Sequence, residues 1–573
     1  MTTPQPDGIS IRTVADTSTP VGRRLFSIAP LLDRLLGINQ MDRFYKRHRL
    51  AGLPADQFSA AVLKHLDIAL NAPEDLKTLF PSEGPLVVVA NHPHGGIEGL
   101  VLIKLLSELR PDIKILANAA LKVFREISSH LLYVNPLKAS DPANRRGFRQ
   151  GLQHLRAGGV LVVFPAGRTS FYQPDLNCIA DSEWSRSAAA LARKTGAKIG
   201  VMRFTGHNSK MFYRLGAIWY RFRLLMLARE MMKMRGQSIE VLAGPAVHVD
   251  QFKALDDDQL TEVIRLSSAS LTPPDHIAAA AQASERALAP PRRSDAIEAE
   301  LSALPAARHV AKTKGMIVSY AQRDEIPELV LQIARERERT FRLLDEGSGE
   351  PMDTDHYDDE YDHVVCWDHQ THALVGAYRV CPGRALDAAS PTYLHRMFTF
   401  ERSFFTDHGG TLELGRSFIT PEFQRNRYAL DLLWKGIGGY LLAHPNLKRL
   451  YGTVSLTRQY DASSIMMMCD ALITPSKLVA PRVGFQAPLP AEWYRMKREG
   501  KIDLAMLNTI VSARELDGKG IPVLLRHYAG LNAQFHTVGV DTHFADTPGL
   551  LLSVDLDRLP ASKQKRYLTP TDQ

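Results

Sequence analysis

The stretch that decides the fold of the N-terminal half is GPLVVVANHPHGGIEGL, residues 84–100. Its β-branched run Val87–Val89 is bounded by turn residues, which predicts a strand in the middle of a sheet. The segment IEGLVLIKLLSEL, residues 97–109, follows at once and predicts a helix. The polar residues between strand and helix therefore occupy a loop at a strand end, where α/β proteins bind ligands.

A histidine in such a loop can accept a proton near neutral pH, and a nearby carboxylate can orient it and stabilise its charged form. His92 and Glu98 fit this description, and His94 is the competing base. Gly95 and Gly96 allow a sharp turn, and their backbone N–H groups are candidates to stabilise an oxyanion.

A second strand and loop follow at GGVLVVFPAGRTSFY, residues 158–172. The run Val160–Phe164 predicts a strand that leads into Pro165, Ala166, Gly167 and Arg168. The guanidinium of Arg168 is suited to hold a carboxylate or phosphate group of a substrate.

The blocks NHPHGGIEG, FPAGR and IGVMRFTGHNS together resemble the PlsC-like lysophospholipid acyltransferases. The resemblance implies that His92 is the general base, that Glu98 orients it, and that the Arg168 block binds the acceptor. Two features depart from the family pattern. Five residues instead of four separate His92 from its carboxylate, which is a Glu, and Ala166 replaces a glutamate of the acceptor block.

The C-terminal half carries another series of blocks. They are RERTF (337–341), DDEYDH (358–363), LVGAYR (374–379), LELGRSFITPEFQRN (412–426) and ALDLLWKGIGGYLL (429–442). The middle blocks predict two strands and then a loop that opens a helix. Such a loop is suited to a pyrophosphate or a phosphopantetheine group.

These blocks resemble the GNAT superfamily, and within it the acyl-homoserine-lactone synthases and ornithine lipid N-acyltransferases. The resemblance implies roles for three groups of residues. Arg337 and Phe341 would shape the entrance, Asp359, Glu360 and Asp362 the amine site, and Arg379, Glu413 and Arg416 the central site. Glu413 would be the base that deprotonates the amine, or alternatively a buried partner of Arg416.

The donor loop implied by this resemblance comprises Gln424, Arg425, Asn426 and Arg427. It lacks the glycines with which the superfamily cradles a nucleotide pyrophosphate, so we expect acyl carrier protein rather than free coenzyme A as donor. Acyl carrier proteins are acidic, and exposed Arg425 and Arg427 would steer their docking. No tightly bound cofactor is expected. The four cysteines are widely spaced, which argues against structural zinc.

A chain of 573 residues is long for one core. Residues 271–306 are rich in Ala and Pro and predict a linker. We therefore expect a PlsC-like α/β domain at 1–270 and a GNAT-fold mixed α/β domain at 307–573. No repeat relates the two halves.

Charge is unevenly distributed. Residues 21–50 hold seven Lys/Arg against two Asp, and residues 201–236 hold eight against one Glu, mixed with apolar side chains. This pattern favours segments that lie in a membrane interface, although core helices with basic outer faces are the alternative. No base-reading module suggests nucleic acid. With no spanning apolar run and no secretion signal, we expect a peripheral protein on the cytoplasmic face of the inner membrane.

Residues 341–370 show the opposite imbalance, with ten Asp/Glu and one Arg. They form either a solvated loop or a site for a cationic substrate. The order of the two domains is similar to that of the bifunctional ornithine lipid synthases (OlsF-type). That resemblance implies N-acylation of ornithine with a 3-hydroxyacyl group by the C-terminal domain and O-acylation of the product by the N-terminal domain. The alternatives are a lysophospholipid acyltransferase with a regulatory distal domain and a non-enzymatic carrier-protein scaffold at the membrane.

Overall fold

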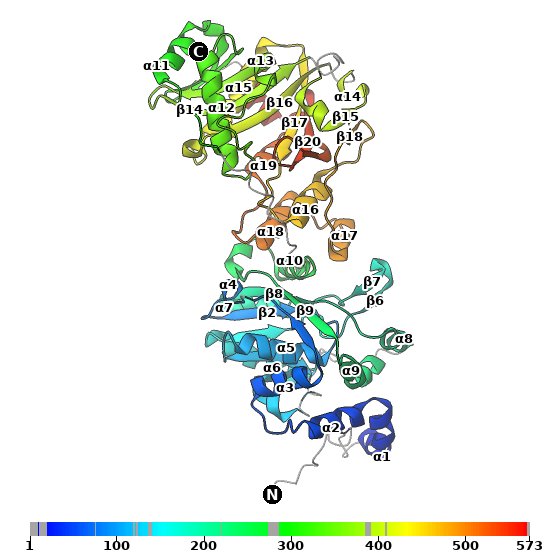
Figure 1. The fold of residues 1–573 in the computed structure, drawn as a ribbon. Coiled ribbons are helices and arrows are strands. Elements are labelled where there is room, and N and C mark those ends of the chain that lie inside the picture. The colour runs from blue at the N-terminus through cyan, green and yellow to red at the C-terminus, as the bar shows by residue number, and fades with distance from the viewer. Residues whose placement is uncertain are drawn as a thin grey trace. The chain divides into compact units, whose positions relative to one another are not determined.

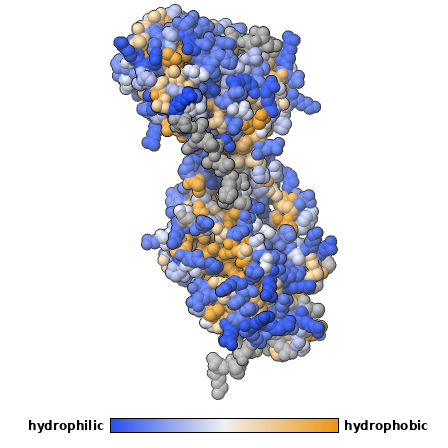
Figure 2. All heavy atoms as spheres, viewed as in Figure 1, coloured by the Kyte–Doolittle hydropathy of each residue, from blue (hydrophilic) through white to orange (hydrophobic). Residues whose placement is uncertain are grey.

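The computed structural model forms two compact units. The first unit comprises Met1–Asp275 and Pro490–Gly518, and the second comprises His276–Leu489 and Lys519–Gln573. Most of the surface in Figure 2 is hydrophilic, with smaller apolar areas between. The structure describes residues 10, 20–74, 76–118, 121, 124–135, 140–218, 221–272, 286–383, 391–406 and 409–569.

The first unit is built on a mostly parallel sheet, shown with its helices in Figure 1. The strand order is β1 (Ala69–Asn71), β9 (Ser238–Ala243), β8 (Lys198–Phe204), β2 (Leu86–Ala90), β5 (Val160–Val163), β3 (Ile113–Asn118) and β4 (Leu131–Val134), and β10 (Val247–His248) pairs with β8. Strand β2 is central and every one of its residues is buried, because helices cover both faces of such a sheet.

Helices of the first unit pack in two groups. Helix α5 (Gly96–Ser107) follows β2, as the sequence predicts, and packs against α3 (Ala55–His65). Helix α7 (Ser187–Thr195) packs against both α6 (Pro142–Arg156) and α10 (Asp257–Ala269). The crossovers through α5 and α6 run in opposite directions along the sheet, and right-handed connections therefore place these helices on opposite faces.

The two basic segments meet in the first unit. Residues 21–50 form α1 (Pro20–Leu35) and α2 (Ile38–Arg47), and residues 201–236 include the end of β8 and the helices α8 (Lys210–Ile218) and α9 (Arg221–Lys233). Helix α2 packs against α9. On α1, Phe26, Ile28 and Leu31 are 40%, 48% and 61% exposed. In the described residues, no helix is both long and apolar enough to cross a membrane.

Residues 490–518 depart from the expected division, because they belong to the first unit. They form α17 (Ala491–Arg498) and α18 (Leu504–Arg514), which pack on α10. Trp493 and Met496 are completely buried. Arg495 forms an ion pair with Glu262 of α10. Burial of these apolar side chains on α10 explains why the segment leaves the C-terminal domain with which it is continuous in sequence.

The expected linker is also partly folded. Residues 273–285 lie outside the described residues, but α11 (Ser294–Ala303) packs against α12 (Pro327–Arg342) in the second unit. Ile297, Leu301 and Leu304 are spaced for one face of a helical turn and join the core of that unit. The second unit therefore begins before residue 307.

The second unit is built on a twisted sheet of eight strands. Their order is β11 (His309–Thr313), β12 (Met316–Ala321), β13 (Asp362–Asp368), β14 (Ala373–Pro382), β16 (Gly410–Ile419), β17 (Leu447–Ser455), β20 (Thr547–Asp555) and β19 (Gln534–Asp541). All neighbours are antiparallel except β16 and β17, which are parallel. Helix α15 (Ala429–Ala443) connects this parallel pair and packs on β11 and β13.

Candidate active sites

The first unit contains a cavity of about 1150 Å³ beside the C-terminal ends of β2 and β5. One part of its wall is apolar and includes Ile103, Ile115, Leu121, Ile127 and Leu131. Another part is polar and includes His92, Arg168 and Arg223. A cavity of this size and composition can hold long acyl chains next to a reactive polar group.

His92 stands at this cavity with Glu98 behind it. Its Nδ1 atom lies 3.5 Å from Oε1 of Glu98, and its ring centroid lies 4.5 Å from that of Phe164. The His92 side chain is 19% exposed, whereas Glu98 is fully buried. The imidazole therefore reaches the cavity with one side and a carboxylate with the other, as a general base requires.

The position of Glu98 follows from the start of α5. Glu98 is the third residue of that helix, and its Oε1 accepts hydrogen bonds from the N–H groups of His94 (2.6 Å) and Gly95 (3.0 Å). Gly95 has φ 110°, and a Cβ there would come within 2.5 Å of Leu227. The Gly95 amide is engaged with Glu98, so it is not free to stabilise an oxyanion.

His94 occupies a different environment. It is buried, its Nε2 lies 2.9 Å from the carbonyl oxygen of Thr205, and it does not line the cavity. Asn208 donates to the carbonyl oxygens of Pro93 and His94 and fixes the same loop. The geometry thus favours His92 over His94 as the base.

The charges around His92 shift its titration. Burial lowers the pKa of His92, but the carboxylates of Glu98 and Asp181 outweigh this effect, and the net result is a raised pKa. Burial raises the pKa of Glu98, but the opposing effect of His92 and His94 is larger. The net result is a lowered pKa, so Glu98 is held in its charged form.

Asp181 is a member of this site that the sequence did not reveal. It follows β7 (Cys178–Ala180), and its Oδ1 lies 3.3 Å from the backbone nitrogen of His92, which donates to it. Trp184 donates to its other oxygen at 2.9 Å, and Ser170 donates to Oδ1. Burial raises the pKa of Asp181. No motif marks this residue, which is distant from His92 in sequence.

Arg168 lines the cavity, as the strand-to-loop pattern predicts, but it has a neighbour. The guanidinium carbons of Arg168 and Arg223 lie 5.1 Å and 4.6 Å from the centroid of the Phe171 ring. Burial lowers the pKa of Arg223, and the charge of Arg168 lowers it further. Two cations held at one cavity wall are suited to an anionic group such as a phosphate.

The second unit has a smaller cavity, of about 100 Å³. Its lining includes Phe341, Arg379, Glu413 and Arg416 from the predicted site. It also includes residues that the sequence did not suggest, among them Tyr361, Tyr393, Ser455, Asp541 and Phe544.

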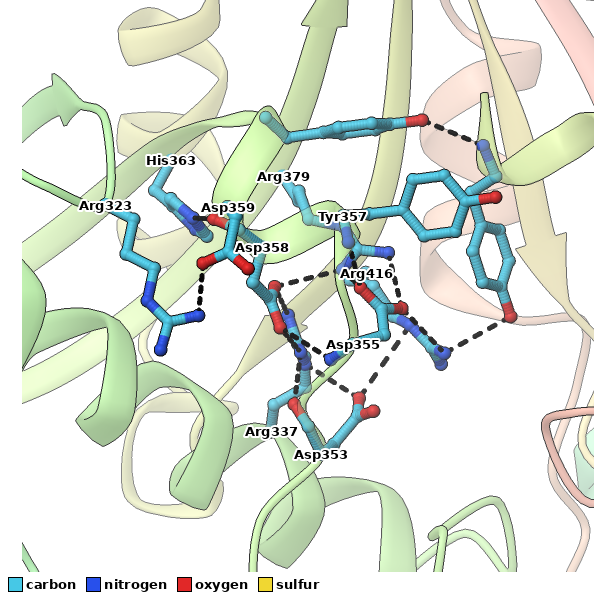
Figure 3. Close-up of polar contacts among 12 residues, drawn as sticks. Arg323, Arg337, Asp353, Asp355, Tyr357, Asp358, Asp359, His363, Arg379 and Arg416 are labelled. Atoms are coloured by element: carbon cyan, nitrogen blue, oxygen red, sulfur yellow. Dashed lines mark hydrogen bonds and ion pairs between the residues drawn. The ribbon is translucent and has the colours of Figure 1, made fainter. Parts of the chain in front are cut away.

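Beside this cavity lies a charge cluster, shown in Figure 3, of the three arginines Arg337, Arg379 and Arg416 and the three aspartates Asp353, Asp355 and Asp358. Arg337 Nε lies 2.7 Å from Asp353 Oδ2, and its Nη2 lies 3.1 Å from Asp358 Oδ2. Arg379 Nη1 lies 2.5 Å from Asp355 and 2.9 Å from Asp358. Because each charge has an opposite neighbour, these groups can remain ionised while buried.

The structure places the predicted acidic residues elsewhere. Asp359 is 59% exposed and pairs with Arg323, Glu360 is exposed, and Asp362 accepts a hydrogen bond from Tyr440. None of them lines the cavity. The reason is α13 (Tyr357–Glu360), a single turn that directs Asp358 inward and the next two residues outward. Arg337 is likewise buried in the cluster and does not line the cavity.

Glu413 and Arg416 both reach the cavity, but they are not partners. Glu413 is buried and accepts a hydrogen bond from Tyr361 at 3.0 Å, and burial raises its pKa. Arg416 Nε lies 3.8 Å from Asp353 Oδ2, and its guanidinium covers the ring of Phe544. Residues three apart face opposite sides of a regular strand. Here Arg416 has φ 50°, and the pairing of β14 with β16 shifts register, so both side chains face the cavity.

The predicted donor loop lies between β16 and α15. Asn426 accepts a hydrogen bond from the backbone of Tyr428, and Gln424 donates to the carbonyl oxygen of Ile419. Arg425 and Arg427 are exposed, and Arg427 lies over the ring of Tyr428. None of the four predicted donor residues lines the smaller cavity.

Among the described residues, no three or more His, Cys, Asp or Glu side chains are grouped so that they could hold a metal ion.

Comparison with known proteins gives matches in both halves. Residues 71–205 match the acyltransferase family, and residues 337–435 match the acetyltransferase (GNAT) domain family. A glycine N(alpha)-acyltransferase from Phocaeicola vulgatus is 29% identical over 300 residues, which cover 46% of this chain and 88% of that protein. A lyso-glycine lipid O-acyltransferase from the same organism is 25% identical over 187 residues, covering 31% of this chain and 65% of that protein.

Among solved structures, the 1-acyl-sn-glycerophosphate acyltransferase PlsC from Thermotoga maritima matches with a TM-score of 0.26 and 15% identity, covering 37% of this chain and 75% of that one. The family matches and the α/β architecture agree with the expected fold class. The chain therefore combines a PlsC-like acyltransferase domain in its N-terminal part with a GNAT domain in its C-terminal part.

Proposed function

We propose that the chain makes a doubly acylated aminolipid. The second unit transfers a 3-hydroxyacyl group to the α-amine of an amino acid, and the first unit acylates the new 3-hydroxyl group. The observation that carries this proposal is that two separate candidate sites lie in domains that match two acyltransferase families, in a chain that is similar both to an N-acyltransferase and to a lyso-lipid O-acyltransferase.

N-acylation needs an uncharged amine held next to a thioester. Glu413 is the proposed base, acting through a water molecule, because it is buried at the cavity and its raised pKa suits proton transfer. Arg416 is the proposed partner of the amino-acid carboxylate. The amine attacks the thioester carbonyl, the C–S bond breaks, and the proton released from nitrogen reaches the leaving thiolate by way of Glu413.

The head group that we propose is ornithine. The acidic residues on which the sequence argument rested face away from the cavity, but Asp541 lines it and accepts hydrogen bonds from Tyr393 and from the His543 amide. Its carboxylate is the proposed partner of the side-chain ammonium. Glycine, which appears in the names of the relatives, would need no such partner and is the alternative.

O-acylation uses the His92 site. His92 takes the proton of the 3-hydroxyl group as its oxygen attacks the second thioester, and then returns that proton to the departing thiolate. Glu98 stabilises the imidazolium between these two events. The larger cavity provides room for both acyl chains, and Arg168 with Arg223 provides positive charge for the phosphate of the donor's phosphopantetheine arm.

The proposed donor in both steps is acyl carrier protein, with exposed Arg425 and Arg427 steering it to the second unit. The proposed location is the cytoplasmic face of the inner membrane. Helix α1 supports membrane contact, because exposed Phe26, Ile28 and Leu31 share it with Arg23 and Arg24.

Mass spectrometry of lipids from a host that lacks aminolipids tests the proposal. Expression of the chain should yield mono- and diacylated aminolipid, and feeding labelled ornithine or labelled glycine should identify the head group. New or remodelled phospholipid without aminolipid would instead indicate a lysophospholipid acyltransferase. No lipid product from purified chain, amino acid and acylated carrier protein would indicate a scaffold.

A further inference from the structure

Helix α6 in the first unit carries an unusual concentration of positive charge. Its sequence is PANRRGFRQGLQHLR, with four arginines and no Asp or Glu. Arg145, Arg146, Arg149 and Arg156 are all exposed. Within the described part of the chain, Arg145, Arg146 and Arg149 take part in no ion pair.

This charge does not help the helix. Arg145 lies at the end of the first turn of α6, where the helix dipole disfavours cations. Arg145 and Arg149 are four residues apart, and like charges at that spacing cost a few tenths of a kcal/mol. The N-terminus is already capped by Asp141, which accepts from the Ala143 amide. A binding role accounts for arginines that the helix itself disfavours.

The position of α6 relates this charge to the larger cavity. Asp141, Ala143, Asn144 and Phe148 line that cavity. Gly147 is buried against the sheet, and a Cβ there would lie 2.7 Å from the carbonyl oxygen of Tyr133. The close packing at Gly147 fixes the rotation of α6, so the exposed arginines stand beside the cavity-lining residues on the outer face of the helix.

We propose that Arg145, Arg146 and Arg149 form a docking site for an acidic carrier protein that delivers its acyl thioester into the cavity of the first unit. This inference rests on the proposed O-acylation. Acidic helices on the carrier would meet the arginine surface, and the prosthetic arm would enter beside Asn144 and Phe148. The arginines that face the cavity itself, Arg168 and Arg223, are separate and would meet the phosphate of the arm.

Complementary charge of this kind acts mainly on encounter and affinity rather than on the chemical step. A small thioester donor that lacks the carrier should gain nothing from exposed arginines outside the cavity. Loss of the docking site should therefore slow the reaction with the carrier-bound donor and not the reaction with a small thioester that bears the same acyl group. It should also leave binding of the acceptor lipid unchanged.

The test compares the full chain with the variant Arg145→Glu/Arg146→Glu/Arg149→Glu. O-acylation of synthetic mono-acyl aminolipid is measured with one acyl group on carrier protein and on pantetheine. The ratio of kcat/KM for carrier to that for pantetheine should fall at least 30-fold through KM, and its dependence on salt should weaken. The matched control is Lys77→Glu/Lys194→Glu/Lys198→Glu, which changes net charge equally at exposed residues that do not line the cavity.

An unchanged ratio, or an equal fall for both donors, would overturn the proposal, as would loss of binding to phosphatidylglycerol vesicles with unaltered carrier kinetics. Docking can also be measured without acyl transfer, by photo-cross-linking of the carrier protein to a photoreactive residue that replaces exposed Gln150. Carrier cross-linked there supports the docking site even if the chain makes no O-acylated product, a result that would sink only the proposed function. Absence of the cross-link counts against the docking site.

Discussion

Nδ1 of His92 and Oε1 of Glu98 lie 3.5 Å apart, with five residues between them. The first turn of α5 makes this possible, because Glu98 points back toward the loop and accepts the amides of His94 and Gly95. One carboxylate thus caps a helix and supports the candidate base. The longer side chain of Glu compensates for the extra loop residue.

Substitution of the two histidines should give different results. His92→Ala is expected to lower O-acylation by about 10²–10⁴-fold, the usual contribution of a general base, so that mono-acylated aminolipid accumulates. His94→Ala removes the bond to the Thr205 carbonyl and should lower the melting temperature more than the rate. Kinetics and thermal melting of both variants check this, and a larger rate loss in the His94 variant would exchange their roles.

The pH profile of O-acylation should depend on Glu98. A base must be unprotonated, so activity falls as pH drops through the pKa of His92, which Glu98 helps to raise. Glu98→Gln removes that negative charge while burial remains, so the pKa of His92 falls and the acidic limb moves to lower pH. The plateau should fall about 10²-fold as the imidazolium loses its counter-charge. A limb that stays in place would show that another group titrates.

Glu413→Gln should abolish both lipids in cells, because O-acylation then lacks its acceptor. With purified protein, N-acylation should fall about 10²–10⁴-fold, whereas O-acylation of added mono-acyl lipid should persist. Glu350→Gln, which alters an exposed carboxylate paired with Arg286, is the control. Product analysis by mass spectrometry separates the two steps, and retained N-acylation would exclude Glu413 as the base.

Glu346 predicts a pH-dependent loss of stability in the second unit. Burial raises its pKa to about 7, and Ser455 of the cavity donates to it. The pKa of Glu346 is higher in the folded state than in the unfolded chain. Ionisation of this carboxyl therefore does not lower the free energy of unfolding at pH 4, but lowers it increasingly as the pH rises to 8. A rise of this size corresponds to about 3 kcal/mol. Glu346→Gln should therefore raise the melting temperature at pH 8 more than at pH 5, and equal effects would contradict the assignment.

Trp493→Ala should damage the first unit although the residue belongs to the C-terminal half of the sequence. Trp493 is fully buried, and truncation of such a side chain costs about 3–5 kcal/mol. O-acylation should be lost at a lower temperature while N-acylation survives. Tyr494→Ala, at a neighbour that is 52% exposed, is the control. If N-acylation were lost at a lower temperature than O-acylation, α17 would be stabilising the second unit, and its assignment to the first unit would be wrong.

Local sequence was sufficient for some of these features. The β-branched run of β2, the glycines after it and the apolar helix α5 are consecutive, so the loop that holds His92 could be predicted. Glu98 could be predicted as well, because it lies in the first turn of the helix that follows this loop. Asp181 and Arg223 come from distant segments, and no spacing rule connects them with His92.

The acidic block shows a different limit. Composition gives the number of charged residues in a segment but not the direction in which each side chain points. Within one helical turn, Asp358 faces the buried arginines while Asp359 faces solvent. Composition does not distinguish Asp353 and Asp355 either, although both pair with the buried arginines. The division of the chain erred at 490–518 because sequence order gives no sign that Arg495 will meet Glu262.

The return of residues 490–518 to α10 affects how the protein can be made. The ribosome must polymerise all of residues 276–489 before Trp493 can cover α10. The first unit therefore cannot complete its core until most of the second unit has been synthesised, and a nascent chain that ends at residue 275 would leave apolar surface of α10 exposed for chaperones to shield.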